Sequence, residues 1–267
     1  MHERSIGAET SPAPRPRRTR GRAAAVAALA TASAVGLSLI GSAPAFAADP
    51  THTIAQVQGT TTATPLSGQT VTVEGVVTAD HRTGGYRGIY VQTAGSGGST
   101  DATPGASDGI FVFLSGNPAA GVALGDKVRV TGRVSEFNTV TQITASAAGS
   151  VELVQAGFGV PAVTPLPATV LGSSREQFEG MLVRPTGTYK LVSSHNLQNF
   201  GELWTSAGST MPVEAFETQA PGTPAAAAIT TANNNARLLL DDGYSIRVDN
   251  AAHPGDQPYF TKDVVVR

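Results

Sequence analysis

Basic side chains alternate with apolar ones in the run from Gly125 to Val134. Successive side chains of a strand point to opposite faces, so Lys127, Arg129 and Arg133 share one face, opposite the intervening valines. Aromatic rings beside such a basic row stack on nucleic-acid bases, while the cations contact phosphates. The candidate nucleic-acid-binding residues are therefore Tyr90, Lys127, Arg129, Arg133, Phe137 and Asn138. The alternative is the ordinary solvated outer face of a half-buried strand.

Motifs for catalysis or metal binding are absent from the sequence. His195 follows Ser193 and Ser194, but the Gly-X-Ser-X-Gly elbow of a hydrolase is missing. The remaining histidines lack metal-ligand spacing, and Asp241-Asp242-Gly243 predicts a plain turn rather than a calcium loop. The chain has no cysteine, which excludes disulfides and thiolate sites. We expect no catalytic residue, no metal ligand and no cofactor in these residues.

Five short strands are expected to carry the basic row. Alternating apolar and polar residues, broken by Gly-rich turns, favour a small closed barrel. Gly75 and Gly132 fall within strands, where a missing side chain indicates a bulge or a sharp coil. The predicted strands are Val71–Thr78, Gly88–Gln92, Gly109–Phe113, Gly125–Val134 and Gln142–Thr144. We therefore predict an all-β chain with an OB-like five-stranded barrel at residues 71–144, a β-sandwich being the competing architecture.

Composition assigns the segments on either side of the barrel. Residues 48–70 are rich in Thr and form an N-terminal lead-in that either adds an edge strand or stays flexible. Residues 145–172 are rich in Ala, Gly and Pro, which predicts a linker. Residues 173–267 begin with a sequence like a capping box, Ser173–Phe178, which predicts one short helix.

The rest of residues 173–267 predicts a second β-rich, OB-like unit. Glu179–Val183 echoes Glu74–Val77, and further short strands follow it. No counterpart of the closing strand after Gly125-Asp126 is found, so this second barrel is expected to be incomplete and to leave an edge unpaired. We therefore expect the chain to be the N-terminal part of a longer protein.

The first 47 residues predict an export signal. Arginines from position 15 to 22 precede an apolar stretch at 23–40, and Ser42–Ala47 ends in an Ala-X-Ala pattern, which predicts cleavage after Ala47. General secretion is preferred to the twin-arginine route, because the hydrophobic residue expected after Arg17-Arg18 is missing. A membrane anchor is the alternative, since the apolar stretch is barely long enough to span a bilayer. The mature chain is predicted to be extracellular, with no membrane attachment.

Removal of this signal makes the chain more acidic. The full sequence has 18 basic and 20 acidic side chains, and the first 47 residues hold six and two of them, which leaves a net charge of −6. Proteins that coat nucleic acid are normally basic overall. Any nucleic-acid binding must therefore come from a local patch.

The order of several short motifs resembles a known family. The motifs are Ile54–Gly59, Pro65–Thr78, Ser107–Val112, Gly125–Phe137 and Phe178–Val183. Over about residues 54–243 they resemble the region ahead of the catalytic domain in secreted bacterial nucleases of the ExeM/NucH type. The resemblance implies an OB-like segment followed by a metal-dependent endonuclease/exonuclease/phosphatase domain, which would use a divalent cation, Mg or Ca. It also implies a chain that is itself non-catalytic, with extracellular DNA or RNA and that downstream catalytic domain as partners. Such a chain would either bind nucleic acid or act as a scaffold for the catalytic domain.

Two other functions stay open from the sequence. Exposed Tyr86, Tyr90 and Trp204 would stack on sugar rings in an extracellular carbohydrate-binding or adhesion module. A purely structural spacer would bind no ligand. Salt separates these classes, because only binding through phosphate contacts weakens steeply as salt rises. The sequence gives no oligomeric state.

Overall fold

The computed structural model describes residues 49–83, 85–116, 119–243 and 264–266. The predicted export signal at residues 1–47 lies outside these ranges. Within them, no helix has the length and hydrophobicity needed to cross a bilayer. The elements in chain order are α1 (Ile54–Gln58), β1 (Thr70–His81), β2 (Gly88–Gln92), β3 (Gly109–Leu114), β4 (Lys127–Phe137), β5 (Val140–Ala145), β6 (Val151–Gln155), β7 (Thr164–Pro167), the 3-10 helix η1 (Gly172–Phe178), β8 (Leu182–Thr186), β9 (Tyr189–Ser193), α2 (Leu197–Phe200), β10 (Leu203–Ala207), α3 (Ala215–Thr218), α4 (Pro224–Ala236), β11 (Arg237–Leu240) and β12 (Val264–Val265).

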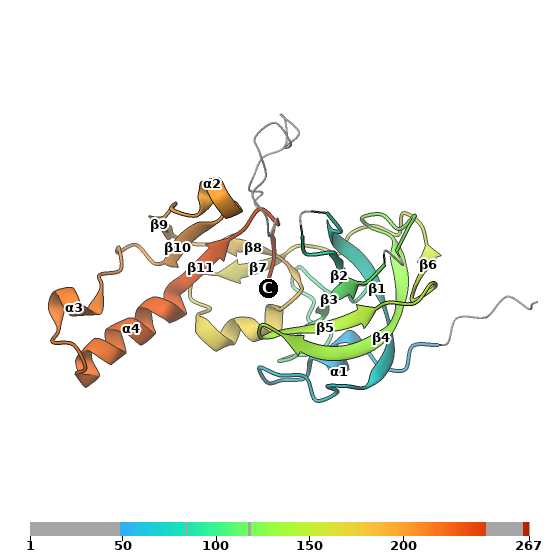
Figure 1. The fold of residues 1–267 in the computed structure, drawn as a ribbon, viewed down its shortest axis with the longest axis horizontal. Coiled ribbons are helices and arrows are strands. Elements are labelled where there is room, and N and C mark those ends of the chain that lie inside the picture. The colour runs from blue at the N-terminus through green and yellow to red at the C-terminus, as the bar shows by residue number, and fades with distance from the viewer. Residues whose placement is uncertain (1–48, 84, 117–118, 244–263, 267) are drawn as a thin grey trace, which may run out of the picture. The chain divides into compact units, whose positions relative to one another are not determined.

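Strands β1 to β5 form a closed, OB-like barrel (Figure 1). The strand order is β1-β2-β3-β5-β4, and β4 pairs back onto β1 to close the wall. Strands β3 and β5 run parallel, while the other barrel pairs are antiparallel. The predicted all-β fold with a five-stranded barrel is confirmed, and the closing β1–β4 pair excludes a sandwich.

Two glycines allow β1 and β4 each to pair with two neighbouring strands of the barrel. Strand β1 pairs with β4 along its first half and with β2 along its second half, and β4 passes from β1 to β5 in the same way. A Cβ atom on Gly75 would lie 2.7 Å from the carbonyl oxygen of Gln92, and one on Gly132 would lie 2.4 Å from that of Thr144. Both strands therefore coil tightly at a residue that must lack a side chain. The bulge in β1 comes slightly later, after Val77.

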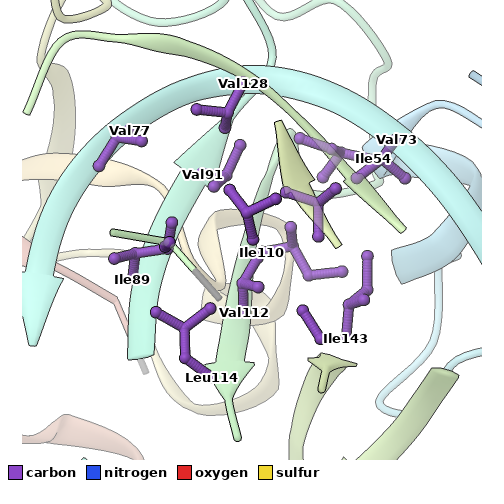
Figure 2. Close-up of a cluster of buried hydrophobic side chains, with 14 of the residues drawn as sticks. Ile54, Val73, Val77, Ile89, Val91, Ile110, Val112, Leu114, Val128 and Ile143 are labelled. Carbon is purple, nitrogen blue, oxygen red and sulfur yellow. The ribbon is translucent and has the colours of Figure 1, made fainter. Parts of the chain in front are cut away.

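Aliphatic side chains from all five strands converge in the barrel interior (Figure 2). The valines that alternate with the basic residues of β4 are all buried there, as the period-two pattern predicts. Ile89, Ile110 and Ile143 are fully buried beside them. Each such side chain contributes about 1.5–3 kcal/mol by leaving water, so this core is the main source of the barrel's stability.

The lead-in contributes a helix to this core, which differs from the predicted edge strand. Thr53 caps α1, because its Oγ1 accepts a bond of 3.1 Å from the Gln56 N–H while its own N–H donates to Gln56 Oε1 at 2.9 Å. Such reciprocal bonds satisfy donors that a helix start leaves open. Ile54 and Val57, three residues apart on one helical face, then join the barrel core.

The segment predicted as a linker contains two strands. Strand β6 pairs antiparallel with β4 and extends the barrel wall, and β7 pairs in parallel with β8. Pro165 and Pro167 fit in β7 because it lies at the edge of its sheet, where a missing N–H donor costs no ladder bond. Pro-rich composition therefore marks an edge strand here rather than a spacer.

The second unit is β-rich, and its described residues contribute to two open three-stranded sheets, one of which also includes β7 from residues 145–172. Their strand orders are β11-β10-β9 and β12-β8-β7. Leu166, Met181 and Val183 form its small separate core. The helix expected at Ser173–Phe178 is the 3-10 helix η1, which has no side-chain cap. Helix α4 was not expected; Thr223 caps it, and a proline and four alanines in its first turns favour a helix start.

Candidate functional site

The predicted basic row lies on the outer wall of the barrel, where β4 meets β1 and β6. Lys127 Nζ lies 2.5 Å from the Glu74 carboxylate, and Arg129 Nη2 lies 2.9 Å from its other oxygen. Lys127 also lies over the ring of Phe158, 5.6 Å from its centre. Arg133 is exposed at the far end of the row. Two of the three predicted cations thus share one carboxylate as their partner.

Glu74 is held in its charged form by this arrangement. It stands directly opposite Arg129 in the β1–β4 register, which makes the two a cross-strand pair. The hydrogen bond from Lys127 and then that from Arg129 keep the pKa of Glu74 below its usual value, against the opposing effect of its burial. Glu74 therefore cancels one of the three positive charges of the row, and two of its cations already have a partner.

Tyr90 and Asn138 lie away from the basic row. Tyr90 contacts Phe111, its partner on β3, with ring centres 5.0 Å apart, and meets His81 edge-on at 5.7 Å. Asn138 forms the β4–β5 turn with a φ of 50°. Both residues line one cavity of about 1140 Å³, whereas the neighbouring Phe137 is 58% exposed and does not line it. The structure thus splits the predicted site into two surfaces.

The cavity borders the face that OB barrels use for ligands. In such barrels the β2–β3 face and the β1–β2 and β4–β5 loops hold oligonucleotides or oligosaccharides. Tyr86 reaches the cavity from the β1–β2 loop, and Asn138 and Thr139 reach it from the β4–β5 loop. Trp204 of β10 and Arg237 of β11 come from the second unit, with the guanidinium 4.9 Å from the indole centre. One cavity therefore combines aromatic rings from both parts of the fold with arginine side chains from the second unit.

Hydrogen bonds link the two sides of the cavity. Tyr86 donates its hydroxyl proton to Asp241 Oδ2 at 2.8 Å, and Asp241 Oδ1 accepts the Gly243 N–H at 2.7 Å. Arg175 donates to the carbonyl oxygens of Val170 and Arg237, while its Nη2 is buried and has no hydrogen-bond partner. Burial lowers the pKa of Arg175 from its usual value. The cavity wall thus holds a guanidinium with one unused donor group.

Carboxyl groups form a further cluster on this wall. Glu179 is only 5% exposed, and its Oε1 accepts the Thr141 N–H at 2.7 Å. Its backbone N–H donates to the Glu176 carbonyl oxygen at 3.0 Å, and the carboxyls of Glu176 and Glu136 lie near enough to act on its charge. Burial, followed by the charge of Glu176, raises the pKa of Glu179 to about 8, and burial raises that of Glu176 as well. In the described ranges, no group of three or more His, Cys, Asp or Glu residues could hold a metal ion.

Sequence reasoning missed Arg175, Glu176 and Glu179. The i, i+3 spacing of the two glutamates on a helical turn was the available signal, because it places both carboxyls on one side. Tyr86, Tyr90 and Trp204, which the sequence suggested for stacking on sugars, do line one cavity, although Tyr90 is buried rather than exposed.

No protein-family model matches this chain, and no curated protein matches it. The resemblance to ExeM/NucH-type nucleases therefore stays a prediction, and the functional argument rests on the geometry of the cavity.

Proposed function

We propose that this chain is a non-catalytic OB-fold module of a secreted nuclease, which holds a nucleic-acid strand for a metal-dependent phosphodiesterase domain. The observation that carries the proposal is the cavity of about 1140 Å³ beside β1 and β2 of the barrel, into which both ligand-binding loops of an OB fold reach. Its volume exceeds that of common small-molecule pockets and suits part of a polymer.

The side chains of the cavity match the needs of single-strand binding. Tyr86 and Trp204 line the cavity and are half-buried, and stacking of a base on such a ring is worth about 1–3 kcal/mol. Tyr90 is largely covered and would support the other rings rather than stack. Arg237, which is exposed, would contact phosphate oxygens. The basic row of β4 has a lesser role, because Glu74 already pairs with two of its cations.

Binding of the full chain to labelled single-stranded DNA, RNA and duplex DNA over a salt series tests the proposal. Affinity should fall as salt rises, because bound phosphates release counterions. Trp204→Ala should weaken single-strand binding about tenfold, from the lost stacking. Lys127→Ala is the matched control and should change the affinity little. Absence of binding at low salt by a folded protein, or an equal loss in the control, would overturn this reading.

A carbohydrate-binding module is the second candidate, favoured by a separate observation. Tyr86, Tyr90 and Trp204 come from distant parts of the chain to one cavity, which Asp241 and Asp242 also line. Aromatic faces with carboxylate acceptors suit the apolar faces and hydroxyl groups of sugar rings. Binding to soluble polysaccharides that Trp204→Ala abolishes and salt leaves unchanged would favour this function over the first.

A further inference from the structure

The chain after η1 is joined to the barrel by direct contact of backbones. A Cβ atom on Gly109 would lie 2.2 Å from the carbonyl carbon of Gly180, and one on Gly180 would lie 2.6 Å from the Ile110 nitrogen. No side chain fits at either position, so the two backbones touch. We call the contact between residues 179–182 and the barrel the seam.

Hydrogen bonds fasten the seam on both sides of this contact. Ser107 Oγ donates to the carbonyl oxygen of Glu179, and the Leu182 N–H donates to Gln92 Oε1 at 2.9 Å. Gln92 and Glu179 are buried, so these bonds are shielded from water. The seam therefore fixes the start of β8 against the barrel and, with it, the second-unit wall of the cavity.

The carboxyl of Glu179 is the titratable group within the seam. Its Oε1 accepts the Thr141 N–H from β5 at 2.7 Å, and its backbone N–H donates to the carbonyl oxygen of Glu176 in η1 at 3.0 Å. Two other titratable groups act on its charge, and both are carboxyls: Glu176 of η1 and Glu136 of β4. Glu136 Oε1 accepts the Thr64 N–H and the Thr141 hydroxyl, and its buried Oε2 has no partner.

A buried carboxyl that faces other carboxyls is most stable with its proton bound. Burial and the charge of Glu176 raise the pKa of Glu179 to about 8, so Glu179 keeps that proton at neutral pH. Loss of the proton would leave a buried, ionised Glu179 facing two other carboxyls. Like charges repel more strongly in such surroundings than in water.

The sign of the pH dependence follows from proton binding. The folded chain keeps a proton on Glu179 that the unfolded chain, with an ordinary pKa of 4.5, releases at lower pH. This contribution to stability is complete below pH 4.5 and declines as the pH rises to about 8. The seam is thus strongest in acid.

We propose that Glu176 and Glu179 form a proton-dependent latch, which fastens the seam most firmly in acid and loosens it, and with it the cavity, as the pH rises toward the alkaline range. The pH dependence of the seam does not depend on whether the cavity binds a ligand. Its effect on ligand binding rests on the proposed function, because an open seam would move Trp204 and Arg237 away from the barrel loops.

A pH titration of the full chain from about pH 6 to about pH 9 tests the latch. Trp204 is the only tryptophan and lines the cavity, so its fluorescence reports on the second-unit wall. The amide chemical shift of Thr141, which donates to Glu179, reports on the carboxyl itself. We expect one transition in both signals, with a midpoint near that of Glu179, at about 8.

Substitutions distinguish the latch from other titrations. Glu179→Gln keeps a donor and an acceptor but cannot ionise, so the transition should disappear from both signals. Glu176→Gln removes the facing charge and should move the midpoint to lower pH, which provides a second test if the first variant does not fold. Glu217→Gln, on the exposed helix α3, should leave the transition unchanged. A transition that persists in Glu179→Gln, or its absence from the unmodified chain, would overturn the latch.

Single-strand DNA binding, measured at both ends of the titration, separates this inference from the proposed function. The latch predicts that affinity falls at high pH in the unmodified chain and stays constant in Glu179→Gln. A titrating seam in a protein that binds no nucleic acid at any pH would overturn the proposed function alone. Binding with constant affinity and an unchanging Thr141 signal would overturn the latch alone.

Discussion

Glu74 pairs with two of the three basic side chains of β4. Its carboxylate accepts from Lys127 and Arg129 at 2.5 and 2.9 Å, and all three side chains are at most 24% exposed. The arrangement turns a potential phosphate contact into a structural ion pair between β1 and β4. A partly buried network of this kind stabilises more than an isolated surface pair, although each ion still loses hydration.

Glu74→Gln should therefore reduce stability and reveal the basic row. We expect the free energy of unfolding to fall by about 1 kcal/mol at neutral pH. Glu74 has a lowered pKa, so its stabilising effect exists above its unfolded value of 4.5 and is lost as the pH falls through the lower folded value. The difference between variant and unmodified chain in urea denaturation should thus vanish in strong acid.

The same variant should bind duplex DNA more tightly at low salt, because two cations are released on the outer wall. Glu217→Gln makes the same change in net charge on α3 and is the control. An equal gain in DNA affinity in both variants would show that net charge alone, rather than the basic row, is responsible.

Strands β1 and β4 are the two strands that close the barrel. Each pairs with two neighbours and coils between them, which closes the barrel with five strands. The coil is possible because a glycine stands where the neighbouring strand comes closest. Helix α1 and strand β6 are additions to this barrel, one to the core and one to the wall.

Gly132→Ala tests the tight coil of β4. The new methyl group would lie 2.4 Å from the Thr144 carbonyl oxygen and 2.6 Å from Ile143 Cγ2, and the backbone atom has no room to move away. We expect the free energy of unfolding to fall by about 1–3 kcal/mol, the usual cost of overpacking, measured by urea denaturation. Thr131→Ala, at the exposed position before it, should cost less than about 1 kcal/mol. Equal stability of Gly132→Ala and the unmodified chain would contradict a steric need for glycine.

The whole molecule is organised by the seam between the barrel and the second unit. The barrel has a core of its own with members from all five strands, while the second unit has only a small one. The cavity depends on both, since Tyr86 and Asn138 come from the barrel and Trp204 from the second unit. Separation of the two would abolish the cavity while leaving the barrel core intact.

Gly109→Ala should produce that separation. Its Cβ would overlap the Gly180 backbone, whereas the core side chains of β3 would keep their places. We expect hydrogen-exchange protection of β1–β5 to persist while proteolysis of the second unit accelerates and ligand binding falls by at least tenfold. Ser107→Ala removes one seam hydrogen bond and should have a smaller effect. Loss of protection throughout the barrel in Gly109→Ala would show instead that the two parts fold as one unit.

The sequence alone predicted the five barrel strands, the glycines at their coils and the outward direction of Lys127, Arg129 and Arg133. Alternation along a strand records which side chains are buried, and this information is local. The helix α1 was missed, because its signal is a single short turn whose stability comes from Ile54 and Val57 in the barrel core.

Tertiary structure alone decided which of these residues act together. Pairing of Glu74 with Lys127 and Arg129 depends on the register of β1 against β4, and the bond between Tyr86 and Asp241 joins residues 155 positions apart. The raised pKa of Glu179 likewise depends on burial against β5. Charge state and ligand geometry are set by neighbours in space, and those neighbours exist only once the barrel has closed and the second unit has docked on it.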